Sequence, residues 1–177
     1  FCIMKIEELE IMSPVGSYES LMAAIEAGAD SVYFGVGELN MRSKSANNFT
    51  IEDLKEIVRI AKENGVKTYL TMNTVIYDQE MDYMQSVIDA AKESGLSAII
   101  ASDMAVISYA REVGVEVHLS TQCNITNCRA VKFFSKYADV IVTARELSLD
   151  KVKHITSWIK DNDIRGASGK PLRIECF

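Results

Sequence analysis

The stretch Val113-Gly114-Val115-Glu116-Val117-His118-Leu119-Ser120 joins the end of an expected helix to an expected strand through one glycine. From Val115 to Ser120, apolar and polar residues alternate, which is typical of a strand with one face in an apolar core. Similar helix-glycine-strand junctions occur at Ala27-Gly28-Ala29-Asp30, Asn64-Gly65-Val66-Lys67 and Ser94-Gly95-Leu96-Ser97. The chain is therefore built from a repeating unit, and this repeat determines the expected fold.

Strands that alternate with helices in this way pair in parallel through right-handed crossovers, which places the chain in the α/β class. The strands are predicted at about Leu9–Met12, Asp30–Gly37, Val66–Met72, Leu96–Ala101, Val115–Leu119, Asp139–Thr143 and Leu172–Phe177. Unbroken repetition favours a (β/α) barrel of the TIM type, which has eight strands over roughly 250 residues. The 177 residues therefore predict one domain over residues 1–177, an incomplete barrel of about seven strands that stops before closure.

The composition, 48% hydrophobic and 25% charged, is that of a globular protein. Acidic residues (25) outnumber basic ones (19), and the net charge of −6 argues against nucleic-acid binding by this chain alone. No apolar run approaches the roughly 20 residues that span a bilayer, and Phe1–Met4 is too short for the core of a signal peptide. We therefore expect a cytoplasmic protein with no membrane partner. The open edges of an incomplete barrel predict pairing with another copy or with the rest of a longer protein.

Cysteine and histidine are sparse. Cys123 and Cys128 are close in sequence, but they lack the nearby third thiol of an iron–sulfur loop with that spacing. His118 lies five residues before Cys123, a spacing that places the two side chains on opposite faces of a strand. We therefore expect buried, unreactive cysteines and no metal site within this chain.

Polar side chains at the strand exits define the candidate site, because the active sites of (β/α) barrels lie at the carboxyl ends of the strands. Asp103 or Glu175 can act as general base where its surroundings raise its pKa. Arg42 and Arg145 can hold a carboxylate or phosphate bidentately. Asn73, Gln122 and Asn124 can recognise an amide or a base edge. The expected substrate-binding set is Tyr33, Arg42, Asn73, Ser120, Gln122, Asn124, Arg145 and Glu146.

Some of these residues also have plain structural interpretations. Asp103 is well placed to cap a helix, and Asn124 or Thr126 can cap the helix that begins near Cys128. Arg145 and Glu146 can form a surface pair. No Ser-His-Asp order and no thiol near a histidine stands out, so the residues give little support to a nucleophilic protease.

Several segments spread over nearly the whole chain carry a family resemblance. They are Ser13–Glu19, Ala23–Gly35, Asn48-Phe49, Asn73-Thr74, Ser120–Asn124, Arg145–Ser148 and Ile174–Phe177. In combination they resemble the collagenase-like peptidases, peptidase family U32. This resemblance implies a (β/α) barrel that forms the amino-terminal part of a longer protein.

The resemblance also implies an activity. The family is named for peptidases, and other members take part in hydroxylating RNA bases, such as uridine at the tRNA wobble position, or the ubiquinone ring. These members use a 4Fe–4S cluster, and the tRNA reaction depends on prephenate. The family's cluster cysteines follow the segment matched by Glu175-Cys176-Phe177, and Cys176 is not one of them. We therefore expect no cofactor in this chain and a 4Fe–4S cluster in the full-length protein.

Three functions follow as hypotheses. The first is the barrel of an enzyme that hydroxylates RNA bases, with a small anionic molecule or RNA as partner through the full-length protein. The second is a peptidase, as the family name says. The third is a non-catalytic binding or assembly module.

Overall fold

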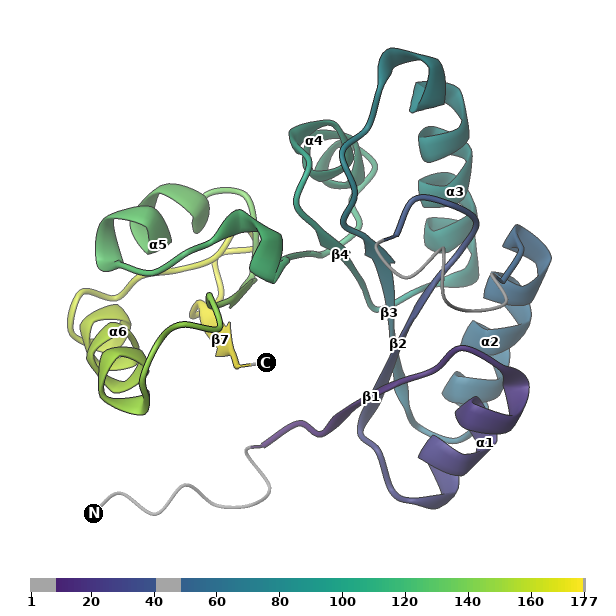
Figure 1. Ribbon diagram of the computed structural model, residues 1–177, viewed down its shortest axis with the longest axis horizontal. Coiled ribbons are helices and arrows are strands. Elements are labelled where there is room, and N and C mark those ends of the chain that lie inside the picture. Colours follow the sequence, from purple (N-terminus) through teal and green to yellow (C-terminus); the bar gives the residue numbers. More distant parts are fainter. Residues whose placement is uncertain (1–8, 41–48, 177) are drawn as a thin grey trace.

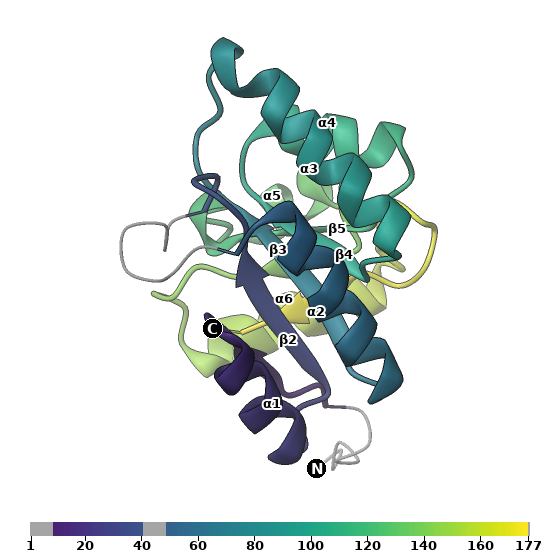
Figure 2. The same ribbon diagram turned by 90° about the vertical axis from the view of Figure 1, so that its right-hand side faces the viewer.

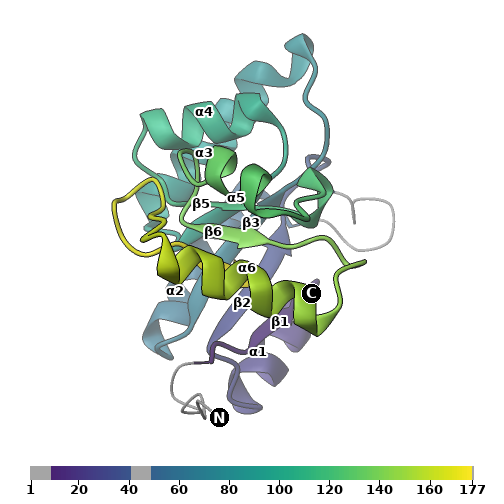
Figure 3. The ribbon, with the colours of Figure 1, turned by 90° about the vertical axis from the view of Figure 1, so that its left-hand side faces the viewer.

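The computed structural model describes residues 9–40 and 49–176. Within them, seven parallel strands form one sheet in the order of the sequence, β1-β2-β3-β4-β5-β6-β7. The strands are β1 (Met12–Pro14), β2 (Ser31–Gly35), β3 (Lys67–Met72), β4 (Ala98–Ala101), β5 (Val117–Leu119), β6 (Val140–Val142) and β7 (Arg173–Glu175). The sheet curls into an incomplete TIM-type barrel, as the repeat predicts (Figures 1 and 3).

The helices cover the outer face of this curved sheet (Figures 1 and 2). They are α1 (Tyr18–Glu26), α2 (Ile51–Glu63), α3 (Met81–Ser94), α4 (Met104–Glu112), α5 (Cys128–Phe134) and α6 (Leu149–Asp161), with short 3-10 turns η2 (Asp78–Glu80) and η3 (Thr121–Cys123). Polar side chains cap the starts of α1, α2, α4 and α5, and the cap of α5 is Asn127, not Asn124 or Thr126 as expected. Thr50 and Asp53, for example, form a reciprocal capping box at the start of α2.

The main apolar core lies between the sheet and the helices. Leu54, Ile57 and Ala61 of α2 are fully buried together with strand residues such as Leu70 and Ile99. Burial of each large side chain contributes about 1.5–3 kcal/mol. Because strand residues alternate between faces, these contacts also fix the strand register, and with it the residues that point into the barrel.

All seven strands differ at one or both ends from the sequence-based expectation, by one to three residues. The first strand runs over Met12–Pro14, where Leu9–Met12 was expected. Pro14 belongs to this strand because β1 is an edge strand in the described sheet, and an edge strand tolerates a residue without an N–H donor. The last strand is confined to Arg173–Glu175.

Candidate functional site

The carboxyl ends of the strands enclose a cavity of about 140 Å³. The strand register produces it, because Thr71 lies beside Ile100 and Val142 beside Glu175, with these side chains on the inner face. The lining residues are Met12, Tyr33, Thr71, Asn73, Ile100, Ser120, Thr121, Gln122, Val142, Arg145 and Glu175. Every strand of the described sheet or the segment that follows it therefore contributes to the wall.

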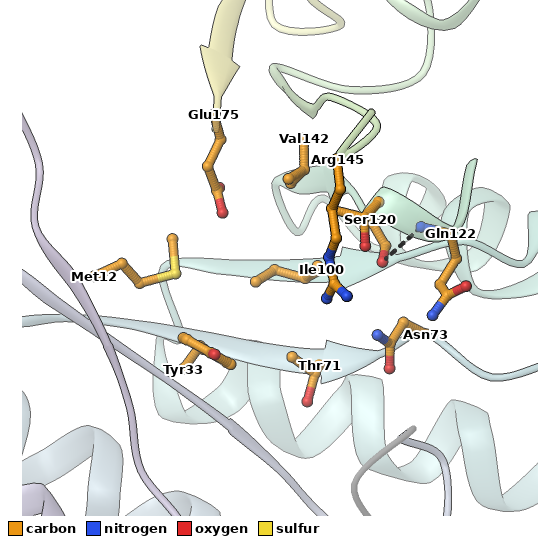
Figure 4. A pocket seen from close by; sticks show the side chains of 11 residues that line it. Met12, Tyr33, Thr71, Asn73, Ile100, Ser120, Gln122, Val142, Arg145 and Glu175 are labelled. Carbon is orange, nitrogen blue, oxygen red and sulfur yellow. Dashed lines mark hydrogen bonds between the residues drawn. The ribbon is translucent and has the colours of Figure 1, made fainter. Parts of the chain in front are cut away.

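The polar groups of the cavity are not evenly distributed (Figure 4). The guanidinium group of Arg145 and the amides of Asn73 and Gln122 lie on one side. Glu175 and Met12 lie on the opposite side. A ligand with an anionic group and an amide-like edge fits this arrangement, because Arg145 can donate two parallel hydrogen bonds and the amides can both donate and accept.

A tight turn presents Gln122 to the cavity. Ser120 caps η3, and its hydroxyl accepts a hydrogen bond from the backbone N–H of Gln122 at 3.3 Å. Asn124 ends the turn in the left-handed conformation (φ 49°), which asparagine tolerates better than most residues. Ile125, immediately afterwards, is fully buried. The turn is therefore anchored at both ends, and the polar run after β5 is a rigid part of the wall.

Glu175 has the strongest electrostatic perturbation in the cavity. Burial raises the pKa of its carboxyl group to about 7, the Glu10 carboxylate adds to the increase, and Arg173 opposes it. A carboxyl group that titrates near neutral pH can accept a proton in one step and return it in another. The raised pKa and the position in the cavity wall therefore suit Glu175 for general acid–base chemistry.

A layer of charged pairs lies on the amino-end side of the cavity. Glu10 accepts hydrogen bonds from Lys67 (2.6 Å) and the Tyr69 hydroxyl, and Glu116 contacts Arg173 (2.6 Å) and His118 (3.1 Å). Burial favours the protonated form of Glu10, but the bonds from Lys67 and Tyr69 outweigh it and lower its pKa. The contact with His118 is the main cause that lowers the pKa of Glu116. Both carboxylates are therefore held ionised, and the charge of Glu10 acts on Glu175.

The structure brings together six of the residues singled out in the sequence, namely Tyr33, Asn73, Ser120, Gln122, Arg145 and Glu175. Asp103 does not line the cavity. Its carboxylate caps α4 at the N–H of Ala105 (2.8 Å) and also accepts from the N–H of Ile76 (3.1 Å). Asn124 and Glu146 also lie outside the lining. Arg42, the expected partner of Arg145, lies outside the described residues.

Sequence reasoning missed five wall residues: Thr121 in the turn after β5, and the strand residues Met12, Thr71, Ile100 and Val142. Strands buried on both faces lack the alternation that would show which side chains point inward. The charged layer did carry a signal, because Lys67 and Arg173 begin strands, and Glu116 directly precedes one, each two residues before an inward-facing position.

The described cysteines do not fit as ligands of an iron–sulfur cluster. Cys123, Cys128 and Cys176 are free thiols, and burial raises the pKa of Cys123 to about 11, which disfavours the thiolate that a metal binds. Among residues 9–40 and 49–176, no three His, Cys, Asp or Glu side chains gather around a common point. In the same residues, no helix is long and apolar enough to cross a bilayer.

Residues 16–177 match the model of peptidase family U32. The chain belongs to this family. A Porphyromonas gingivalis protein named collagenase is 60% identical over 174 residues, which are 98% of this chain and 42% of that protein. The tRNA hydroxylation protein P1 of Bacillus subtilis is 38% identical over 149 residues, 82% of this chain and 35% of that protein.

A solved structure of a U32 peptidase supports the fold, with a TM-score of 0.69 at 18% identity over 84% of this chain and 64% of that one. The chain spans well under half the length of the curated U32 relatives it matches, 42% of the collagenase and 35% of the tRNA hydroxylation protein. Both relatives extend beyond the barrel segment that they share with it.

Proposed function

We propose that this chain is the substrate-binding barrel of an enzyme that hydroxylates a base of RNA. The observation that carries the proposal is the arrangement of Asn73, Gln122 and Arg145 on one side of the same cavity. Amide groups pair with the edge of a base, and a guanidinium group binds an anion such as a phosphate or a carboxylate. The likeness to the tRNA hydroxylation protein P1 supports the same chemistry.

Within this proposal, the chain's own residues bind and orient the substrate and move protons. Arg145 holds the anionic group, and the amides of Asn73 and Gln122 fix the base edge. Glu175, with its pKa raised to about 7, takes up or returns a proton on the opposite side of the cavity. The described residues hold no ligand set for a 4Fe–4S cluster; the cluster that the family resemblance implies for the full-length protein would supply the redox chemistry of the hydroxylation.

The test is complementation of a strain that lacks the gene, followed by mass spectrometry of the nucleosides from its RNA. The wild-type gene should restore a hydroxylated nucleoside, and Arg145→Gln or Gln122→Ala should reduce it about tenfold or more, since each removes a hydrogen bond to the substrate. Arg59→Gln is the matched control, because Arg59 is exposed and pairs with Glu56 and Glu63 on its own helix. An unchanged set of nucleosides after gene deletion contradicts the proposal.

A peptidase is the second candidate, and the collagenase that is 60% identical favours it. Cys123 and His118 do not form a nucleophile–base pair, since the Cys123 thiol faces the carbonyl of Ser102 and the His118 ring contacts Glu116. Glu175 is the group that would activate a water molecule. Cleavage of gelatin by the iron-free full-length protein, lost in Glu175→Gln, would support this candidate. If neither activity is found, a non-catalytic binding module remains.

A further inference from the structure

The surface formed by α5 and the residues just after it has an unusual charge for this acidic chain. Residues 117–138 contain no Asp or Glu, but they include Arg129, Lys132 and Lys136. All three side chains are exposed. In the part of the chain that the structure describes, none of them has an ion-pair or side-chain hydrogen-bond partner, whereas Arg59, Arg165 and Arg173 each pair with a carboxylate.

Aromatic side chains lie among these cations. Phe133 is 54% exposed on α5, and its ring packs against Tyr137 (5.7 Å between centroids) and Phe134 (5.1 Å). The guanidinium group of Arg111, from α4, lies 5.8 Å from the centroid of the Tyr137 ring. Arg129 and Phe133 are four residues apart on α5 and so share one face of the helix, and Tyr137, just after the helix, continues this stripe through its ring contact with Phe133. We call Arg111, Arg129, Lys132, Phe133, Lys136 and Tyr137 the α5 stripe.

An exposed ring among unpaired cations matches the chemistry of single-stranded nucleic acid. Bases stack on aromatic rings, and lysine and arginine neutralise the phosphates between them. A folded protein partner is a poorer match, because the centre of protein interfaces is depleted in lysine. The stripe also follows the cavity wall along the chain, since the cavity residue Gln122 is seven positions before Arg129 at the start of α5.

We propose that the α5 stripe binds the single-stranded RNA that flanks the target base, with Phe133 as the stacking platform and Arg129, Lys132 and Lys136 on the phosphates. The inference rests on the proposed function, since it describes how the same RNA reaches the cavity. The base enters at the carboxyl ends of the strands, and the adjoining strand of RNA runs down the outside of α5.

The experiment measures fluorescence anisotropy of a labelled 12-nucleotide single-stranded RNA with the full-length protein at several salt concentrations. Lys132→Gln combined with Lys136→Gln should weaken binding and reduce the slope of log affinity against log salt by about 1.4, because each phosphate contact contributes roughly 0.7 on a single strand. Lys55→Gln combined with Lys92→Gln is the control, since these lysines lie on α2 and α3, away from α5 (Figure 1). The control should leave the slope unchanged.

Substitutions of Phe133 separate stacking from ordinary apolar contact. Phe133→Leu keeps the apolar bulk but removes the π face, and we expect it to weaken RNA binding about tenfold without a change in salt slope. Phe133→Trp should retain wild-type affinity. Equal affinity for Phe133→Leu and the wild type contradicts the proposal, as does a lysine pair that leaves the slope unchanged. A shift of oligomeric state caused by Phe133→Leu, with RNA affinity intact, would assign the stripe to a protein interface instead.

The two experiments distinguish an error in the RNA-binding role of the α5 stripe from an error in the proposed hydroxylase function. RNA binding that depends on the stripe, without any hydroxylated nucleoside in cells, supports the stripe and contradicts the hydroxylase. A hydroxylated nucleoside that needs Arg145, with stripe variants that bind RNA normally, supports the hydroxylase and contradicts the stripe.

Discussion

Two opposite charges act on Glu175, the Glu10 carboxylate and the Arg173 guanidinium group. The protonation of this cavity residue therefore depends on the layer of charged pairs on the amino-end side of the cavity. Its raised pKa comes first from burial and then from Glu10, whereas Arg173 opposes both. Arg173 precedes Glu175 by two residues on β7, and Glu10 precedes the wall residue Met12 by two residues before β1. The same alternation that points Met12 and Glu175 into the cavity therefore points Glu10 and Arg173 into the barrel beside them.

Glu175→Gln should stabilise the protein at neutral and alkaline pH but not under acid conditions. The folded-state pKa of about 7 exceeds the ordinary 4.5, so the folded protein binds the proton more tightly. The stability contributed by this proton is complete below pH 4.5 and is lost as the pH rises through 7. Allowing for partial solvent exposure, we expect the variant to gain about 2 kcal/mol relative to wild type between pH 4.5 and pH 8. Urea unfolding at both pH values measures this gain, and a constant difference would refute it.

Glu10→Gln should lower the pKa of Glu175, because it removes a nearby negative charge. Arg173→Gln should raise it by removing the opposing positive charge. Carbon-13 NMR titration of the Glu175 carboxyl group measures both shifts. Movement of both variants in the same direction would show that local rearrangement, rather than charge, controls this site.

Helix caps determine which of the polar residues at the strand exits remain available to bind a ligand. Asp103 follows β4 at a typical catalytic position, yet both of its oxygens accept backbone N–H groups. One bond begins α4, and the other holds the segment after β3 at Ile76. Asp103 therefore joins two strand exits, and its role is structural.

Asp103→Ala should destabilise the fold by about 1–2 kcal/mol, because it removes a helix cap and leaves the N–H of Ile76 without its partner. Ser148→Ala is the matched control. Ser148 is the corresponding residue before α6, but its side chain makes no capping hydrogen bond, so we expect a loss of only a few tenths of a kcal/mol. Chemical denaturation of both variants tests the difference, and equal losses would contradict the assignment.

The helices and strands were predictable from the sequence. The residues that line the cavity were predictable only in part. Helix-glycine-strand junctions give the order and the parallel pairing, because a glycine ends or follows each of the helices α1 to α4 and an apolar strand comes next. The same order predicts that residues just after a strand, such as Asn73 and Arg145, lie at the cavity. It does not predict that Thr71 and Ile100 face inward, because strands buried on both faces show no alternation of apolar and polar residues. The helix cap at Asp103 was foreseeable from the sequence and is confirmed, whereas its second bond, to Ile76, joins distant segments and no local pattern reveals it.

At the scale of the whole molecule, the described sheet has two edges. β1 and β7 each pair with a single neighbour, β2 and β6. On β7, the N–H of Arg173 and the carbonyl of Glu175 bond toward the β6 side, to Asp139 and Thr143. The backbone groups of Ile174 therefore face the open edge, where another strand can pair with them.

Residues 1–177 expressed alone should self-associate as concentration rises, and sedimentation velocity from about 1 to 100 µM measures this. Ile174→Pro should weaken the association, because it removes an open-edge donor without touching the hydrogen bonds to β6. Arg165→Gln, in the loop before β7, should leave it unchanged. A stable monomer at all concentrations would contradict the expectation that the edges need a partner.

The cavity wall is distributed over the sheet, with Met12, Tyr33, Thr71, Ile100, Val142 and Glu175 each contributed by a different strand. The backbone ladder that holds the strands does not depend on these side chains. A single-codon change can thus alter what one wall position accepts while the others keep their places. Ligand specificity can in this way change by single substitutions while the fold is retained. Relatives named for peptide cleavage and for RNA modification are therefore expected to share one barrel fold.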